Sequence, residues 1–303
     1  MKNRKSQAEH TARLSRRRDT MFFYSLMMPA MVIVVVMTAL PLLYALILSF
    51  TNHHLASPDE AQFIGFQNYA TMLTDSKILT SIGNTLFYTF VSVSVSIVLG
   101  LFLAVVINYI TIGKSFFRIA FFAPMMLSAV VIGVIWKFLL NNQLGIISYL
   151  LSLIGVSSPD WFGSPSYAML TVIMVDVWQW TSYVFLLCLA GLESMNMEPV
   201  ESARIDGASA WQIFWYIKLP TILPVIQVAA IFRFTWAFRG FDTIFALTKG
   251  GPGIATETMA LSIWKYAFQQ YDIGLASSLS MLMFLILMVM AVLILNKTFR
   301  KEK

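Results

Sequence analysis

The stretch ESARIDGASAWQIFWYIKLP, from Glu201 to Pro220, brings charged residues into a chain that is otherwise dominated by apolar runs. It lies between two long apolar segments, residues 167–192 and 221–245. The whole connection, residues 193–220, is too long for a simple turn between two helices. We therefore predict that this connection has a fold of its own.

Local signals in residues 193–220 predict two short helices separated by a bend. Pro199, flanked by carboxylates, is typical of a first helical turn, because proline is tolerated there and negative charge favours the positive end of the helix dipole. Gly207 is predicted to end this helix. Ser209 is a good N-cap for a second, aromatic helix, which Pro220 is predicted to close. Such a projection cannot bury its apolar surface alone, so it either packs beneath the rest of the chain or docks on a partner.

The composition predicts an all-α membrane protein. The chain has 303 residues, of which 58% are hydrophobic and 12% charged, and its mean hydropathy is +0.74. Crossing about 30 Å of hydrocarbon takes about 20 apolar residues in a helix. Six runs satisfy this length and are predicted to be transmembrane helices: Phe22–Phe50, Ile82–Asn108, Phe117–Leu140, Tyr167–Leu192, Thr221–Phe245 and Ile273–Leu295.

The basic residues predict the orientation of these helices. Of 21 lysines and arginines, 15 fall in the leading tail (residues 1–20), the closing tail (residues 297–303) and the second and fourth connections. Because cytoplasmic flanks retain Lys and Arg, both termini and residues 193–220 are predicted to be cytoplasmic, with residues 21–296 forming the transmembrane domain. The net charge of +6 is thus a topology signal and does not indicate a nucleic-acid partner.

Recognisable catalytic and metal-binding patterns are absent from the sequence. It contains no HExxH or GxSxG, and His10, His53 and His54 lack further ligands nearby. Residues 113–115 imitate the end of a phosphate-binding loop, but Asn108 stands where that loop needs glycine. We therefore predict no enzymatic activity, no metal and no cofactor in this chain, so that its energy comes from an ion gradient or from another subunit.

The stretch also closely resembles the EAA loop of permease subunits of binding-protein-dependent ATP-binding cassette importers. The matching residues are Glu201, Ala203, Asp206, Gly207, Ala208, Ile217, Leu219 and Pro220. IGFQNYATML (residues 64–73), GLESMNMEPVESARIDGA (residues 191–208) and LTKGGPGIATETMALSIWKYAF (residues 247–268) are similar to the carbohydrate-type members, the maltose and glycerol-phosphate permease group.

This resemblance implies that residues 193–220 contain a coupling helix that sits in a cleft of a cytoplasmic ATPase. It assigns the ATPase contact to Glu201, Ser202, Ala203, Asp206, Gly207 and Ala208. Glu201 is expected to meet a basic group, and Gly207 is expected to give a bend that a side chain would obstruct. Two residues depart from the family pattern: Ser202 replaces the first alanine, and Pro199 stands where the family has another residue.

Ionisable residues inside the predicted spans are candidates for the substrate pathway, because charges in a membrane are costly and usually face the bundle interior. Asp176, Arg233 and Arg239 meet this condition. Arg233 either pairs with Asp176 and braces two helices or contacts the substrate. Arg239 either faces the pathway or reaches the outer interface by snorkelling.

Aromatic residues accompany these charges at helical spacing. Trp180 and Tyr183 follow Asp176 by four and seven residues on one face, and Trp236 precedes Arg239 by three. Sugars present hydroxyls to polar groups and flat C–H faces to aromatic rings, so a cavity with both suits them; the alternative is an aromatic packing stripe. Resemblance to the maltose-type permeases implies that these parts of the two spans line the transport cavity.

We therefore predict one permease subunit of an ATP-driven carbohydrate importer in a bacterial or archaeal inner membrane. The resemblance implies a second permease, a dimeric cytoplasmic ATPase that binds the ATP, and an extracytoplasmic sugar-binding protein as partners. A glycerol-phosphate-type substrate is an alternative that an arginine would also suit. The alternative function is a self-sufficient secondary transporter or channel, in which Asp176 and Arg233 relay an ion or proton. No inverted repeat supports that alternative.

Overall fold

The computed structural model describes residues 2–57, 61–110 and 112–299, and the side chains of residue 22 and of residues 24–293 within those ranges. In chain order the elements are α1 (Lys2–Leu48), α2 (Gln67–Thr74), α3 (Ser76–Tyr109), α4 (Lys114–Phe122), η2 (Ala123–Met126), α5 (Ala129–Leu139), α6 (Ile146–Leu153), α7 (Pro165–Ser194), α8 (Glu198–Ile205), α9 (Ala210–Ile213), η3 (Phe214–Lys218), α10 (Leu219–Phe238), α11 (Asp242–Leu247), α12 (Met259–Phe268) and α13 (Ile273–Phe299). The β-type pairing in these residues is limited to two isolated bridges. The predicted all-α fold is confirmed; residues 300–303 of the predicted closing tail lie outside the described residues.

Within the described residues, five helices are long and apolar enough to cross a membrane: Tyr24–Leu48, Ser76–Tyr109, Pro165–Ser194, Ala210–Phe238 and Ile273–Leu293. A sixth candidate is a bent pair, Lys114–Met126 with Ala129–Leu139, whose halves meet at 102°. The six predicted spans therefore correspond to these elements when the bent pair counts as one. α1 begins at Lys2, so the leading tail is helical and continuous with the first span.

The prediction of one continuous third span, residues 117–140, is wrong because the chain turns in its middle. Pro124 lies in the 3-10 turn η2, and Leu127 after it has extended backbone angles, φ −81° and ψ 141°. Ser128 then starts a new helix, because its side chain accepts a hydrogen bond from the backbone N–H of Val131 at 3.4 Å. Hydropathy alone does not register this turn, since both halves are apolar.

The fifth span differs from its prediction at both ends. It was predicted as residues 221–245 and is one helical stretch, Ala210–Phe238. Pro220 does not close the second helix of the connection, because the π-helical turn η3 directly before it widens the backbone where the proline ring would clash with a carbonyl. The stretch ends before Gly240, and the residues that follow form the separate short helix α11.

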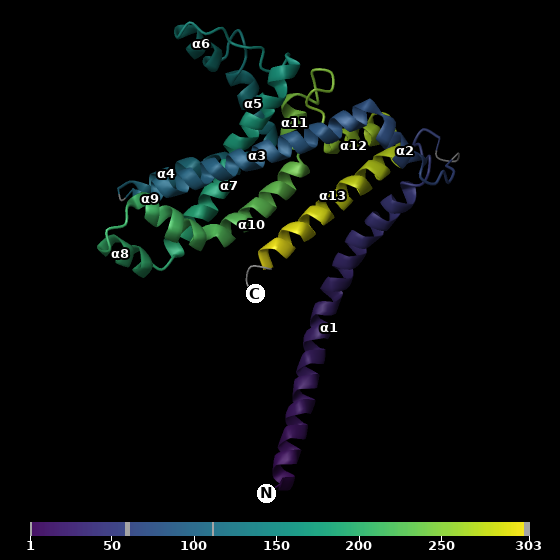
Figure 1. Ribbon diagram of the computed structural model, residues 1–303. Helices are drawn as coiled ribbons and strands as arrows, with labels where there is room; N and C mark the ends of the chain where they lie inside the picture. Colours follow the sequence, from purple (N-terminus) through teal and green to yellow (C-terminus); the bar gives the residue numbers. More distant parts are fainter. Residues whose placement is uncertain (1, 58–60, 111, 300–303) are drawn as a thin grey trace.

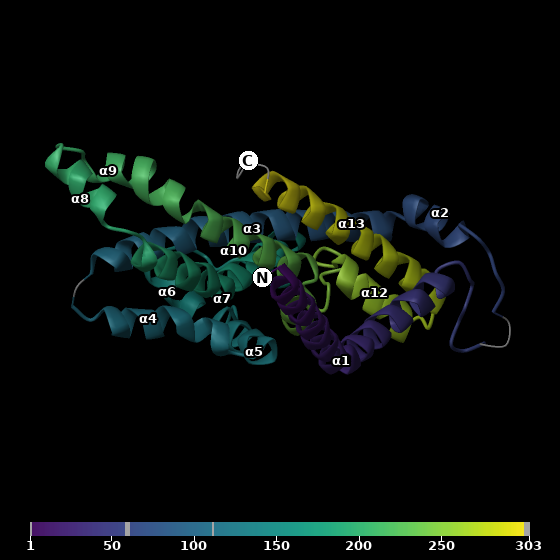
Figure 2. The same cartoon turned by 90° about the horizontal axis from the view of Figure 1, so that it is seen from below.

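Helices α3 and α7 lie side by side at the centre of the bundle and make its most extensive helix–helix contact (Figures 1 and 2). The buried face of α3 carries small residues at intervals of three or four: Ser81, Thr85, Thr89, Ser92, Ser96, Gly100 and Ala104. Small residues let two membrane helices approach closely. The approach is tightest at Gly100, where an added Cβ would lie 2.6 Å from the Cβ of Val184 and 2.9 Å from the backbone N of Phe185.

We expect Gly100→Ala to destabilise the helical bundle by about 1–3 kcal/mol, the usual cost of overpacking a dense core. The added methyl group would push α3 away from the backbone of α7. The measurement is the melting temperature of the purified chain in detergent. The matched control is Gly83→Ala on the same helix, where an added Cβ meets nothing within 4 Å. Equal melting temperatures for the two variants would contradict the close contact.

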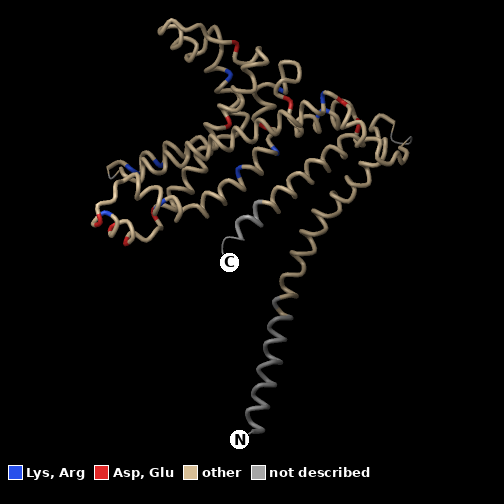
Figure 3. Tube along the Cα trace, in the orientation of Figure 1, with Lys and Arg blue, Asp and Glu red and all other residues tan. Residues whose placement is uncertain are grey.

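Helix α1 stands apart from the bundle that the rest of the chain forms (Figures 1 and 2). Its most apolar stretch, within Tyr24–Leu48, is 0% buried inside the chain. Its described contacts with the bundle include α13. Charged residues are drawn near α12 and the start of α3, and a separate group lies around α8 and the neighbouring helix ends (Figure 3). This end of the bundle carries the connection between α7 and α10.

Candidate functional site

The connection between α7 and α10 has the two-helix form that the sequence predicts. Helix α8 begins at Glu198, with Pro199 in its first turn, so the proline does not disturb its start. Gly207 ends the helix with φ +82°. The N–H of Ala208 donates to the C=O of Ala203 at 2.9 Å, the pattern of a left-handed helix cap.

The bend at Gly207 has a different cause from the predicted one. An added Cβ at this position would meet nothing within 4 Å, so no neighbour obstructs a side chain there. The requirement for glycine comes from the backbone, because a φ of +82° is strained for residues with a side chain.

Ser209 starts the second helix with a complete capping box. Its Oγ accepts from the N–H of Gln212 at 3.3 Å, and the side chain of Gln212 accepts from the N–H of Ser209 at 2.8 Å. The helix then continues through η3 into α10, so the connection is joined to a span without a break. Trp211 and Trp215 meet edge to face, with ring centroids 5.5 Å apart. Trp211 is 69% exposed and Tyr216 80% exposed, which leaves a large aromatic surface open on this projection.

The six residues assigned to ATPase contact lie together around the end of α8. Glu201, Ser202, Asp206 and Gly207 are exposed, whereas Ala203 and Ala208 are half-buried. Glu201 and Arg204 are three residues apart on α8, a spacing that allows an ion pair, but neither forms a salt bridge within the described residues. The carboxylate of Glu201 is therefore available to a partner.

A second site is a cavity of about 530 Å³ among α3, α5, α7, α10 and α11. Its lining includes four of the five residues predicted for the substrate pathway: Asp176, Trp180, Trp236 and Arg239. Tyr183 does not line the cavity and instead packs edge to face on Trp236, with ring centroids 5.1 Å apart. The structure thus brings residues of two predicted spans to one site.

Asp176 and Arg233 form a buried salt bridge, which resolves the alternatives for Arg233 in favour of a structural brace. Arg233 is 0% exposed and does not line the cavity. The other carboxylate oxygen of Asp176 accepts a hydrogen bond of 2.7 Å from the hydroxyl of Tyr88. The triad Tyr88–Asp176–Arg233 therefore joins α3, α7 and α10 and leaves Asp176 electrically compensated.

The cavity combines aromatic rings with uncompensated polar groups. The ring centroids of Trp180 and Trp236 lie 4.7 Å apart, with the ring planes tilted by 40°, and form an aromatic wall. Arg239 and Asp242 are both exposed and form no salt bridge in the described part of the chain. The amide N–H of Gln179 donates to the C=O of Leu127, just after η2, and its buried carbonyl oxygen has no hydrogen-bond partner among the described residues. Such a site can stack against flat apolar faces of a ligand and hydrogen-bond to its hydroxyls.

Among the cavity residues that sequence reasoning missed are three with polar groups: Tyr88, Gln179 and Asp242. Gln179 follows Asp176 by three residues in α7, so helical spacing alone would have placed it on the same face. Asp242 stood within the predicted fifth span and was not singled out there. Tyr88 has no local signal, because its partner Asp176 is 88 residues away.

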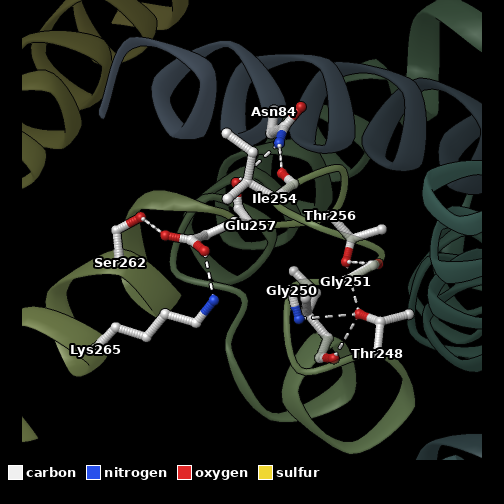
Figure 4. Close-up of polar contacts among 10 residues, drawn as sticks. Asn84, Thr248, Gly250, Gly251, Ile254, Thr256, Glu257, Ser262 and Lys265 are labelled. Atoms are coloured by element: carbon white, nitrogen blue, oxygen red, sulfur yellow. Dashed lines mark hydrogen bonds and ion pairs between the residues drawn. The ribbon is translucent and has the colours of Figure 1, made fainter. Parts of the chain in front are cut away.

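Polar contacts hold the loop between α11 and α12 against α3 (Figure 4). The side chain of Asn84 on α3 donates to the carbonyls of Ile254 and Glu257, both at 3.0 Å. Glu257 in turn forms a salt bridge with Lys265 at 2.5 Å. Because α11 immediately precedes this loop and lines the cavity, these contacts hold the cavity wall against α3.

Tyr266 of α12 lies near the carboxylate of Asp75 at the start of α3. Burial, followed by the nearby carboxylates of Asp75, Glu257 and Asp272, raises the pKa of Tyr266 to about 12. The phenol therefore stays protonated at physiological pH and acts as a donor.

A multi-helix membrane fold with a cavity among its helices and an exposed two-helix projection is typical of a transport subunit. The chain matches the family "binding-protein-dependent transport system inner membrane component" over residues 96–301 and belongs to it. It is 33% identical to the trehalose/maltose transport system permease protein MalF of Thermococcus litoralis, with 92% of this chain and 94% of the relative covered. It is 37% identical to the trehalose transport system permease protein SugA of Mycobacterium tuberculosis (89% and 86% covered) and 36% identical to the probable permease y4oQ of Sinorhizobium fredii (90% and 88%).

Among solved structures, the fold is similar to a chain of a bacterial ABC transporter involved in alginate import. The TM-score is 0.82, with 22% sequence identity and coverage of 95% of this chain and 98% of that chain. At this identity the likeness confirms the fold alone. The chain is thus a multi-pass inner membrane component of a binding-protein-dependent transporter.

Proposed function

We propose that this chain is one of two permease subunits of an ATP-driven carbohydrate importer. The observation that carries the proposal is the projection between α7 and α10: an exposed short helix, a glycine bend and an aromatic helix continuous with a cavity-lining span. This geometry provides a contact surface for a cytoplasmic ATPase and a rigid connection from that surface to the cavity. ATP is bound by the partner and not by this chain.

The proposed orientation places α8 and both termini in the cytoplasm. Lys114, Arg118, Arg204 and Lys218 all belong to the α8 end of the bundle, and short basic flanks favour the cytoplasmic side. A cysteine introduced at Ser202, with Cys188→Ser to remove the native thiol, reports the side directly. A membrane-impermeant maleimide is expected to label it only after the membrane is opened; labelling of intact cells contradicts the orientation.

We propose a neutral or weakly charged oligosaccharide as substrate. The cavity pairs an aromatic wall with groups of both charge signs, Arg239 and Asp242, so that its positive group is accompanied by a negative one. The curated relatives named for sugars are trehalose and trehalose/maltose permeases, which supports this class. The second permease would supply the remaining wall, and a soluble binding protein would deliver the sugar from outside.

The test is uptake of labelled trehalose, maltose and longer glucosides by proteoliposomes that contain both permeases and the ATPase dimer. We expect sugar uptake to require ATP on the side of the membrane that carries the ATPase and the binding protein on the opposite side. An ionophore that collapses ion gradients should leave it unchanged. Uptake driven by an ion gradient with this chain alone would instead establish the alternative, a secondary transporter.

A further inference from the structure

Three charged residues outside the two sites form a compact cluster where α4 begins and α7 ends. Nζ of Lys114 lies 2.5 Å from Oε1 of Glu193, and Nη2 of Arg118 donates to the same oxygen. Lys114 is the first residue of α4, and Glu193 lies in the last turn of α7. One carboxylate therefore joins the ends of two helices that are 75 residues apart in the chain.

Two charges in this cluster, Lys114 and Glu193, oppose the dipoles of their own helices, whereas Arg118 lies in the middle of α4. Helix N-termini favour negative charge and helix C-termini favour positive charge. Helix α4 has no acidic residue in its first turn and starts with Lys114, whereas α7 has no basic residue in its last turn and carries Glu193 there. The cluster therefore does not serve either helix alone, and its effect is to hold the two helix ends together.

The same segment is attached to α7 at two further points. The rings of Phe121 and Phe185 lie 5.6 Å apart in the apolar cluster that follows the charges. Beyond η2, the C=O of Leu127 accepts from the side chain of Gln179 at 3.3 Å, and both residues line the cavity. Residues 114–127 thus run beside α7 from the α8 end of the bundle to the cavity wall.

The projection between α7 and α10 also begins at the end of α7. After Ser194 only three residues, 195–197, separate α7 from α8. We infer that Glu193, held by Lys114 and Arg118, is a positioning residue for energy coupling: it makes residues 114–127 move together with the end of α7, so that displacement of α8 shifts the cavity wall at Leu127. This inference rests on the proposed function.

The cluster is not needed to hold the fold together. The side chains of Lys114, Arg118 and Glu193 are 25%, 39% and 33% exposed, and salt bridges with this much solvent contact contribute little to stability. The apolar contacts of Phe121 remain without it. Removing the charge of Glu193 should therefore leave an assembled complex whose coupling can be measured.

The experiment measures sugar molecules imported per ATP hydrolysed by the complete complex in proteoliposomes, with sugar-loaded binding protein present. For Glu193→Gln we expect this ratio to fall about fivefold, the low end of typical coupling between sites, at unchanged assembly. The matched control Arg118→Lys keeps the positive charge beside Glu193 and is expected to retain the native ratio. A role limited to stability would lower the amount of complex and leave the ratio unchanged.

A native ratio in assembled Glu193→Gln complex would overturn the inference. If that variant does not assemble, Lys114→Gln combined with Arg118→Gln decides, because the double variant removes both ion pairs with Glu193: a lowered ratio in the assembled complex supports the inference and a native ratio overturns it. A native complex that shows no ATP-driven uptake would refute the proposed function itself, so the two failures are distinguishable.

Discussion

Replacing Gly207 by valine is expected to lower ATP-driven sugar uptake about tenfold while the chain still reaches the membrane. At φ +82° a β-branched residue is strained, and relief of this strain would unwind the cap that orients α8 relative to α9. The space around Gly207 is open, so the substitution causes no clash and the bundle should fold normally. The structural effect of the valine is therefore confined to the projection between α7 and α10.

The control for this prediction is Gly207→Asn, because asparagine tolerates left-handed backbone better than other residues with a side chain. Uptake and co-purification of the ATPase are measured for both variants at equal membrane levels. We expect asparagine to retain most of the uptake and valine to lose it. Equal loss in both variants would mean that the side chain itself, and not the backbone bend, is the problem.

Asp176→Ala is expected to cost about 3–5 kcal/mol, because it leaves the fully buried guanidinium of Arg233 without its counter-charge. It also removes the acceptor for the hydroxyl of Tyr88, so the ties between α3, α7 and α10 are lost together. Two nitrogens of Arg233, Nε and Nη1, already have no hydrogen-bond partner among the described residues, so few hydrogen bonds remain to stabilise the unpaired charge. The measurement is the yield of monodisperse chain after detergent extraction.

The matched variant is the double substitution Asp176→Asn with Arg233→Gln, which removes both charges and keeps hydrogen-bonding groups. We expect it to recover much of the yield lost in Asp176→Ala, since no unpaired charge remains buried. If Asp176→Ala alone is extracted as well as the native chain, the triad does not brace the bundle.

Local patterns in the sequence were sufficient to predict that the apolar helices exist and that residues 193–220 form two short helices. Hydropathy gave the existence of each apolar helix, and the proline, the glycine and the N-cap serine gave the two-helix form of residues 193–220. These features depend on residues within a few positions of one another. Three of the cavity residues on α7 and α10, Asp176, Trp180 and Trp236, were found from local patterns as well, as charged or aromatic residues at helical spacing.

The remaining features depend on contacts between distant residues. The turn at Leu127 and the passage of Pro220 through a π-helical turn are both settled by packing, because each local sequence is also compatible with the other outcome. The pairing of Tyr88 with Asp176 and of Lys114 with Glu193 joins helices that are far apart in the chain. Spacing rules carry no information about such pairs.

We propose that the projection between α7 and α10 transmits ATPase action to this chain, and reversing the charge of Glu201 is a direct test of this role. The measurement is ATP hydrolysis by the purified complex with and without sugar-loaded binding protein, for the native chain and for Glu201→Lys. Glu201 is exposed and forms no ion pair within the described chain, so reversing its charge acts only through a partner. If the projection contacts the ATPase, Glu201→Lys abolishes the stimulation of ATP hydrolysis by sugar-loaded binding protein. Full stimulation in that variant, at native assembly, would contradict this role.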